Sequence, residues 1–126
     1  MRRAACKVSL VLAMACGPSE DALVAARLTG GSPDRGRVLL DEHGCGACHH
    51  IPGVRAARGT VGPDLAGLAL RSYIAGRLPN RPTELIRWIR HPQEVEPGNA
   101  MPELGVSERD ARDMAAHLYT LTRAPR

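Results

Sequence analysis

Apolar residues follow helical spacing in three stretches of this chain, and no stretch carries the alternation that is typical of a strand. The first predicted helix covers residues 33–43, with Ser32 as its N-cap and Gly44 as its stop. The second covers residues 82–90 and ends before a His-Pro pair. The third begins after Ser107, and its apolar face consists of Ala111, Met114, Ala115, Leu118 and Leu121. The pattern predicts a small all-α fold.

The segments between these helices are rich in Gly and Pro and are expected to be mostly loops. Residues 50–66 and 96–102 predict irregular loops, and residues 65–74 predict a short helix that Gly76 ends. Residues 16–32 predict a tether that holds no more than a helical turn or two. The expected division is a signal peptide at 1–15, a tether at 16–32 and one domain at 33–126.

The first 15 residues have the composition of an export signal. Three positive residues precede the apolar stretch 8–15, which is too short to cross a bilayer as a helix. Cleavage would leave Cys16 first, and residues 12–17 resemble a bacterial lipobox, in which that cysteine is lipidated. Ordinary removal of a signal that happens to leave a cysteine is the alternative. We expect an exported, periplasmic protein, and we favour a lipid anchor at Cys16.

The scarcity of aromatic residues bears on how this chain can form a hydrophobic core. The 126 residues include no Phe, one Trp and two Tyr, so the aromatic side chains that usually supply much buried area are scarce. A bound apolar cofactor would supply that area instead. Of the 17 basic residues three lie in the signal, which leaves 14 against 13 acidic residues. This near balance does not indicate nucleic-acid binding.

The motif with the most specific chemistry is Cys45-Gly46-Ala47-Cys48-His49. C-x-x-C-H is typical of haem c attachment, in which two thiols bond the porphyrin and the histidine binds the iron. Positions three apart on a helical turn share one face, so Cys45 and Cys48 would reach the same ring. A zinc site would need a second Cys/His pair, and a thioredoxin-like dithiol a β-α-β pattern, and the sequence has neither. We predict one haem c per chain.

The iron's second ligand has several candidates. They are Met101, Met114, His43, His50, His91 and His117. Met114 lies on the apolar face of the last helix, where a core role is favoured. His50 is too close to the motif to reach across the ring, and His43 precedes the motif on the same side. Met101 lies in a loop that prolines stiffen on both sides, which suits a thioether presented to a haem. We predict Met101 as the ligand, with His91 and His117 in reserve.

Together these motifs resemble the class I c-type cytochromes. The resemblance is carried by Gly36, Cys45-x-x-Cys48-His49, Gly62-Pro63-Asp64-Leu65 and Met101-Pro102. It is closer still to the cytochrome c domain fused to subunit II of caa-type haem-copper oxidases, which residues 60–65, 74–80, 88–95 and 97–102 resemble. It covers about residues 34–122 and implies a fold of three to five helices around one covalently bound haem.

The resemblance also implies roles for residues around the haem. The Pro63 carbonyl would accept a hydrogen bond from His49, and Gly36 would pack against the C-terminal helix. Trp88 and Arg71 would donate to the haem propionates, with a core indole and a solvated guanidinium as the alternatives.

The chain departs from the family at several points. Glu96 stands where Lys is expected, and His117 stands where an aromatic residue is usual. Nothing in the sequence resembles the two membrane helices or the copper domain of the oxidase subunit. We therefore expect a detached haem module that works as a separate protein.

Ligation by His49 and Met101 would leave no open position on the iron, which favours single-electron transfer over substrate chemistry. We predict a monomeric, non-enzymatic electron carrier of a bacterial respiratory chain that serves a terminal haem-copper oxidase. Four arginines are candidates to rim the haem edge towards an acidic partner, with an ordinary solvated surface as the equal alternative: Arg55, Arg58, Arg87 and Arg90. The alternatives are a cytochrome subunit of a periplasmic dehydrogenase complex, and a haem sensor or peroxidase-like enzyme in which Met101 dissociates.

Overall fold

The computed structural model describes residues 17–124, so the predicted signal peptide and Cys16 lie outside the described residues. The helices are α1 (Glu20–Thr29), α2 (Pro33–Glu42), α3 (Pro82–Arg90), α4 (Pro92–Val95) and α5 (Glu108–Tyr119), with the 3-10 turns η1 (Cys45–Ala47) and η2 (Leu68–Leu70). The all-α prediction is confirmed, and the three predicted helices correspond to α2, α3 and α5. Within residues 17–124, no helix has the length and apolar character that crossing a bilayer requires.

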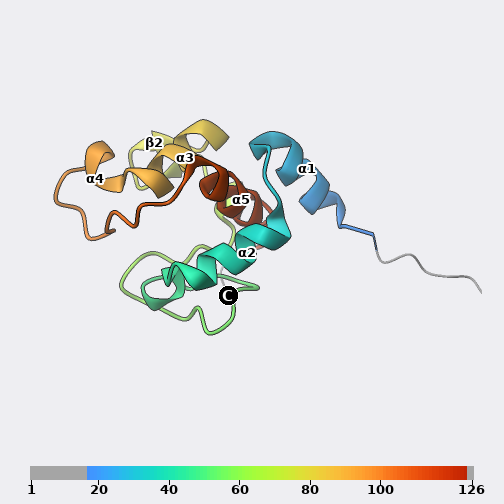
Figure 1. Cartoon of the computed structure of the whole chain (residues 1–126), viewed down its shortest axis with the longest axis horizontal. Helices are drawn as coiled ribbons and strands as arrows, with labels where there is room; N and C mark the ends of the chain where they lie inside the picture. The colour runs from blue at the N-terminus through green and yellow to red at the C-terminus, as the bar shows by residue number, and fades with distance from the viewer. Residues whose placement is uncertain (1–16, 125–126) are drawn as a thin grey trace, which may run out of the picture.

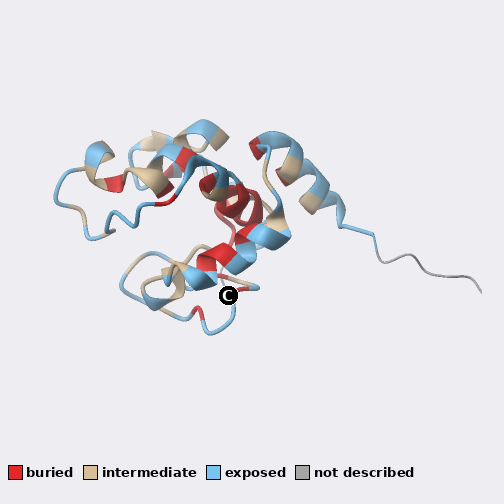
Figure 2. Cartoon of the chain, in the orientation of Figure 1, coloured by how far each residue is buried: buried red, intermediate tan, exposed pale blue. Residues whose placement is uncertain are grey.

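Helix α5 lies at the centre of the molecule, and α1, α2 and α3 pack against it (Figure 1). Ser107 caps its start, because the Ser107 hydroxyl accepts a hydrogen bond from the Asp110 N–H at 3.1 Å. Buried residues are concentrated along this helix (Figure 2), and Ala111, Met114 and Ala115 have no exposed surface. The core therefore runs along α5, as its apolar face predicts.

Helices α2 and α5 cross at very close range. At Gly36 of α2, an added Cβ would overlap the backbone carbonyl of Asp113 in α5, so only glycine fits this crossing. The buried Asp113 carboxylate accepts a hydrogen bond from the Ser32 N–H at 2.7 Å and pairs with Arg35 at 3.0 Å. The predicted packing of Gly36 against the last helix is confirmed.

Helix α1 lies within residues 16–32, for which the sequence predicts a tether with no more than a helical turn or two. A ten-residue helix forms there because the Ser19 hydroxyl caps it and two of its residues, Ala25 and Thr29, are buried. The guanidinium of Arg112 in α5 donates to the Thr29 carbonyl at 3.1 Å. The helix is thus part of the folded body.

Residues 65–79 also differ from the prediction of a short helix. They form η2 and a minimal antiparallel pair, β1 (Tyr73–Ile74) with β2 (Leu78–Pro79), although no strand was expected. Asn80 explains part of this path, because its amide donates to the carbonyls of Leu68 and Arg71 at 2.8 and 2.9 Å. Those carbonyls are then taken by a side chain, and a continuing helix does not form. The Tyr119 hydroxyl in turn donates to Asn80 at 2.8 Å, which ties this segment to α5.

Candidate haem-binding site

A cavity of about 510 Å³ opens between η1, α5 and the segment that follows α4. Its lining is mostly apolar and includes Leu40, Leu68, Leu85, Ile89, Val106 and Leu118. Cavities of about 300–1,000 Å³ with a few polar groups suit small organic ligands and cofactors. All four residues predicted to hold the haem, namely Cys45, Cys48, His49 and Met101, line this one cavity.

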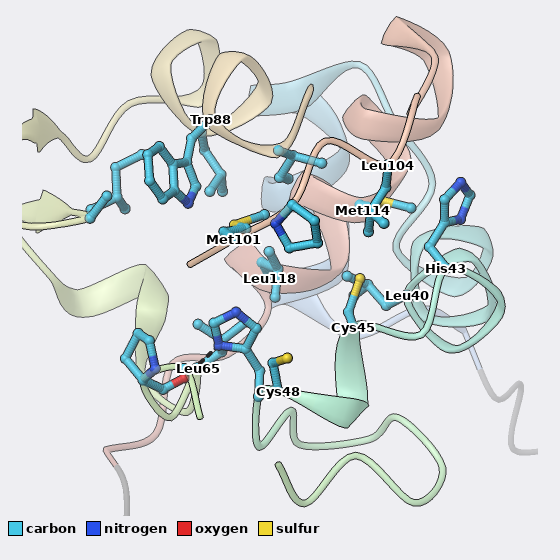
Figure 3. Close-up of a pocket in the computed structure, with 18 of the residues that line it drawn as sticks. Leu40, His43, Cys45, Cys48, Leu65, Trp88, Met101, Leu104, Met114 and Leu118 are labelled. Atoms are coloured by element: carbon cyan, nitrogen blue, oxygen red, sulfur yellow. Dashed lines mark hydrogen bonds between the residues drawn. The ribbon is translucent and has the colours of Figure 1, made fainter. Parts of the chain in front are cut away.

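Helix η1 positions the two thiols. Gly44 ends α2 in the left-handed conformation at φ 69°, and the chain then turns through Cys45–Ala47. Cys45 and Cys48 are not joined to each other, and both are partly buried at the cavity wall. In Figure 3 they lie along one side of the cavity, with Met101 across from them. Burial raises the pKa of the Cys45 thiol above its ordinary value.

The His49 imidazole is fixed by its own loop. Its Nδ1–H donates to the Pro63 carbonyl at 2.7 Å (dashed in Figure 3), which leaves Nε2 with a lone pair for a metal. The hydrogen bond that the resemblance implied for Pro63 is therefore present. A Cβ at Gly62 would come within 3 Å of three ring atoms of His49, so the ring lies directly on this glycine. We did not predict this role for Gly62, although its place in Gly-Pro-Asp-Leu was a signal.

Asp64 continues this loop on the exposed side. Its carboxylate accepts hydrogen bonds from the Ala66 N–H at 2.8 Å and from His50 at 2.9 Å. The hydrogen bond from the Ala66 N–H is the main reason why the pKa of Asp64 lies below its ordinary value, and the hydrogen bond from His50 lowers this pKa further. His50 is thus engaged by Asp64 and does not line the cavity.

Met101 enters the cavity from a segment that side-chain amides hold in place. The Met101 N–H donates to the Asn99 side chain at 2.7 Å, and the Met101 carbonyl accepts from the Gln93 amide at 2.8 Å. The sequence analysis assigned no role to Gln93 or Asn99. The signal available was the presence of two amide residues on either side of a Pro-Gly pair.

The reserve ligands lie elsewhere. Neither His91 nor His117 is among the residues that line the cavity. His117 is buried under residues 52–53, and its Nε2–H donates to the Pro52 carbonyl at 3.1 Å. This burial lowers the pKa of His117 below 6.5. His91 lies 3.8 Å from Glu103, outside the cavity.

Two further candidates, Met114 and His43, do line the cavity. Met114 has no exposed surface and belongs to the core cluster, in agreement with the core role predicted for it. The His43 Nδ1–H donates to the Leu39 carbonyl at 3.0 Å.

Trp88 and Arg71 both line the cavity. Trp88 is partly buried and packs against the core. Arg71 donates through Nη2 to the Asp64 and Ala66 carbonyls, so it is not a freely solvated side chain. Their contact with haem propionates stays a prediction.

None of the four arginines that were candidates for the haem edge lines the cavity. Arg87 and Arg90 lie at a separate hollow beside Leu28 of α1. Arg55 pairs with Asp41 at 3.7 Å, and it and Arg58 are exposed.

The residues present fit a covalently attached haem. Two unpaired thiols stand on one wall, next to an imidazole whose Nε2 is available, and a thioether lies across from them. The apolar lining between them suits a flat hydrophobic ring. Thioether bonds to both cysteines, ligation by His49 and ligation by Met101 are the chemistry this donor set permits.

Comparison with known proteins agrees with this geometry. The sequence profile of the family described as "Cytochrome c" matches residues 33–122. Over 89 residues, 70% of this chain, the sequence is 36% identical to cytochrome c oxidase subunit 2 of Alkalihalophilus pseudofirmus. The matched region is only 25% of that relative's length. No solved structure matches the chain significantly. Since the family match takes in both sides of the cavity, from the C-x-x-C-H turn to the Met101 segment, this chain belongs to the cytochrome c family of electron-transfer proteins.

Proposed function

We propose that the protein is a mono-haem c-type cytochrome that carries single electrons, with Cys45 and Cys48 bonded to the haem and His49 and Met101 bound to its iron. The observation that carries this proposal is the convergence of these four side chains on one apolar cavity. When bound, the haem supplies a one-electron Fe(III)/Fe(II) couple.

The chain's own residues set the conditions for that couple. The Pro63 carbonyl holds His49 in the tautomer that presents Nε2 to a metal. The soft thioether of Met101 favours the ferrous state and so raises the reduction potential. With His49 and Met101 both bound to the iron, the site would offer no open position for a substrate. This arrangement supports an electron carrier in preference to a sensor or a peroxidase.

An optical spectrum of the purified protein tests the ligand set. The protein should be made in cells that attach haem c, and the oxidised form should show a thioether-to-iron charge-transfer band. Met101→Ala should abolish this band, whereas Met114→Leu is the matched control. It changes the other methionine at the cavity, with a small cost in packing, and should keep the band. A band that survives Met101→Ala, or carbon monoxide binding to the reduced wild type at neutral pH, would contradict the proposed ligation.

We further propose that a haem-copper oxidase accepts the electrons and that the protein works outside the cytoplasm. The 36% identity to an oxidase subunit supports the first point. The signal-like residues 1–15 support the second, and residues 12–17 support a lipid anchor at Cys16. Membranes from the organism that encodes this protein should oxidise the added reduced protein, and cyanide should inhibit that reaction. Oxidation that cyanide does not slow would exclude the oxidase as acceptor. The mass of the N-terminal peptide would show whether Cys16 carries a lipid.

A further inference from the structure

We propose that Gln93 and Asn99 are positioning residues for the Met101 ligand: their amide groups lock the backbone of Met101 and so resist its loss from the iron. This inference rests on the proposed function, since it assumes that Met101 binds the iron. Neither residue belongs to the donor set itself, and each acts only through Met101.

Gln93 joins three points of the segment that follows α4. Its Nε2 donates to the carbonyls of Asn99 and Met101, both at 2.8 Å. Its Oε1 accepts from the Gly98 N–H at 3.0 Å. Only this orientation of the amide works, because the reverse would place its oxygen against two carbonyl oxygens. A single side chain in α4 therefore holds both ends of residues 98–101.

The Asn99 side chain links residues 98–101 to α4 and to the residue that follows this helix. Its Nδ2 donates to the carbonyls of Pro92 and Glu96 at 2.9 and 2.7 Å, and its Oδ1 accepts from the Met101 N–H at 2.7 Å. Both polar groups of the Met101 backbone are thus bonded to side-chain amides, the N–H to Asn99 and the carbonyl to Gln93. These bonds are partly buried, where hydrogen bonds compete less with water.

This network acts on the step in which the methionine leaves the iron. A thioether is a weak ligand on a flexible side chain, and an entering ligand has access only in molecules where Met101 has moved away. The apparent affinity of an entering ligand is reduced by the fraction of molecules in that state. If displacing Met101 breaks the amide bonds to its backbone, removing them will raise that fraction. The two hydrogen bonds that Gln93 donates to this segment, to the carbonyls of Asn99 and Met101, correspond at ordinary net strength to a change on the order of tenfold.

Imidazole titration of the oxidised holoprotein measures this fraction. Binding is followed by loss of the thioether charge-transfer band. Gln93→Leu removes the two hydrogen bonds that the side chain donates and the one it accepts from the Gly98 N–H, and it should raise the apparent imidazole affinity about tenfold. Gln93→Glu, which is nearly isosteric, keeps an acceptor for Gly98 but loses the donors, and it should shift the affinity in the same direction. It is the variant to use if the leucine variant does not fold.

Two controls separate positioning from general damage. Arg77→Gln removes an exposed ion pair to Glu96 at 2.9 Å on the same segment and should leave the affinity within about twofold. In a Met101→Ala background there is no methionine to displace and no thioether band, so imidazole binding is followed there by the shift of the main haem absorption band. Adding Gln93→Leu to that background should leave the imidazole affinity unchanged.

The outcomes are distinct. If the wild type lacks the charge-transfer band, the proposed ligation by Met101 is wrong, and the positioning role falls with it. A wild type with the band, but with Gln93 variants that bind imidazole as the wild type does, overturns the positioning role. So does a Gln93→Leu effect of equal size in the Met101→Ala background.

Discussion

The crossing of α2 and α5 makes Gly36→Ala the most informative single substitution for the fold. On an open helix face, alanine would stabilise α2 by about 1 kcal/mol relative to glycine. At Gly36 the added carbon would instead overlap the Asp113 carbonyl and approach the Met114 nitrogen, and these backbone atoms cannot rotate away. The two helices would have to separate.

The expected cost follows from setting these two effects against each other. Overpacking a close contact costs about 1–3 kcal/mol, and the upper end applies where backbone must move. After the gain in propensity, Gly36→Ala should lower the free energy of unfolding by about 2 kcal/mol. For a domain of this size that corresponds to a fall in Tm of about 8–16 °C.

Thermal unfolding of the holoprotein, followed by circular dichroism, measures this shift. Val38→Ala is the control, because Val38 lies on the same helix with 44% of its surface exposed. It should change the stability by no more than about 0.5 kcal/mol. If Gly36→Ala unfolds at or above the wild-type temperature, the close crossing does not constrain this position and the argument is wrong.

Two further predictions concern stability. Because burial lowers the pKa of His117 below 6.5, the unfolded chain takes up a proton at higher pH than the folded one, so stability should fall as pH drops through about 6.5. The urea midpoint should therefore decline less between about pH 7 and pH 5 in His117→Gln than in the wild type, and equal slopes would exclude His117 as the cause. Asp113→Ala should cost about 2–3 kcal/mol in urea unfolding, because it leaves the Ser32 N–H and Arg35 without their buried partner. The exposed Asp41→Ala should cost less than about 0.5 kcal/mol, and similar costs for the two variants would refute the role of Asp113.

The sequence predicts most of the helical framework because its signals are local. Ser32 and Ser107 are cap residues directly before periodic apolar stretches, and α2 and α5 begin where these caps indicate. Local features also identify residues that line the cavity, because the C-x-x-C-H spacing indicates Cys45 and His49 and the flanking prolines indicate Met101. A reader of the sequence could therefore locate both sides of the site.

What the sequence does not predict depends on contacts between distant segments. Helix α1 was assigned to a tether because its glycine-rich ends outweighed its short apolar stretch, and its stability comes from packing on α5. The turn after η2 is set by Asn80, whose partners lie nine and twelve residues away. The amide network around Met101 likewise requires α4 to fold back on residues 98–101. Neither helical periodicity nor motif spacing carries this information.

The position of α1 bears on where this domain can be cut. The family match begins at residue 33, and a protein trimmed to that boundary would keep the whole cavity. It would also lose the Thr29 carbonyl that Arg112 binds and the Ser32 N–H that Asp113 binds. A shortened domain of this kind should therefore bind haem yet unfold more readily, and fusions to other proteins should join the chain ahead of Ser19.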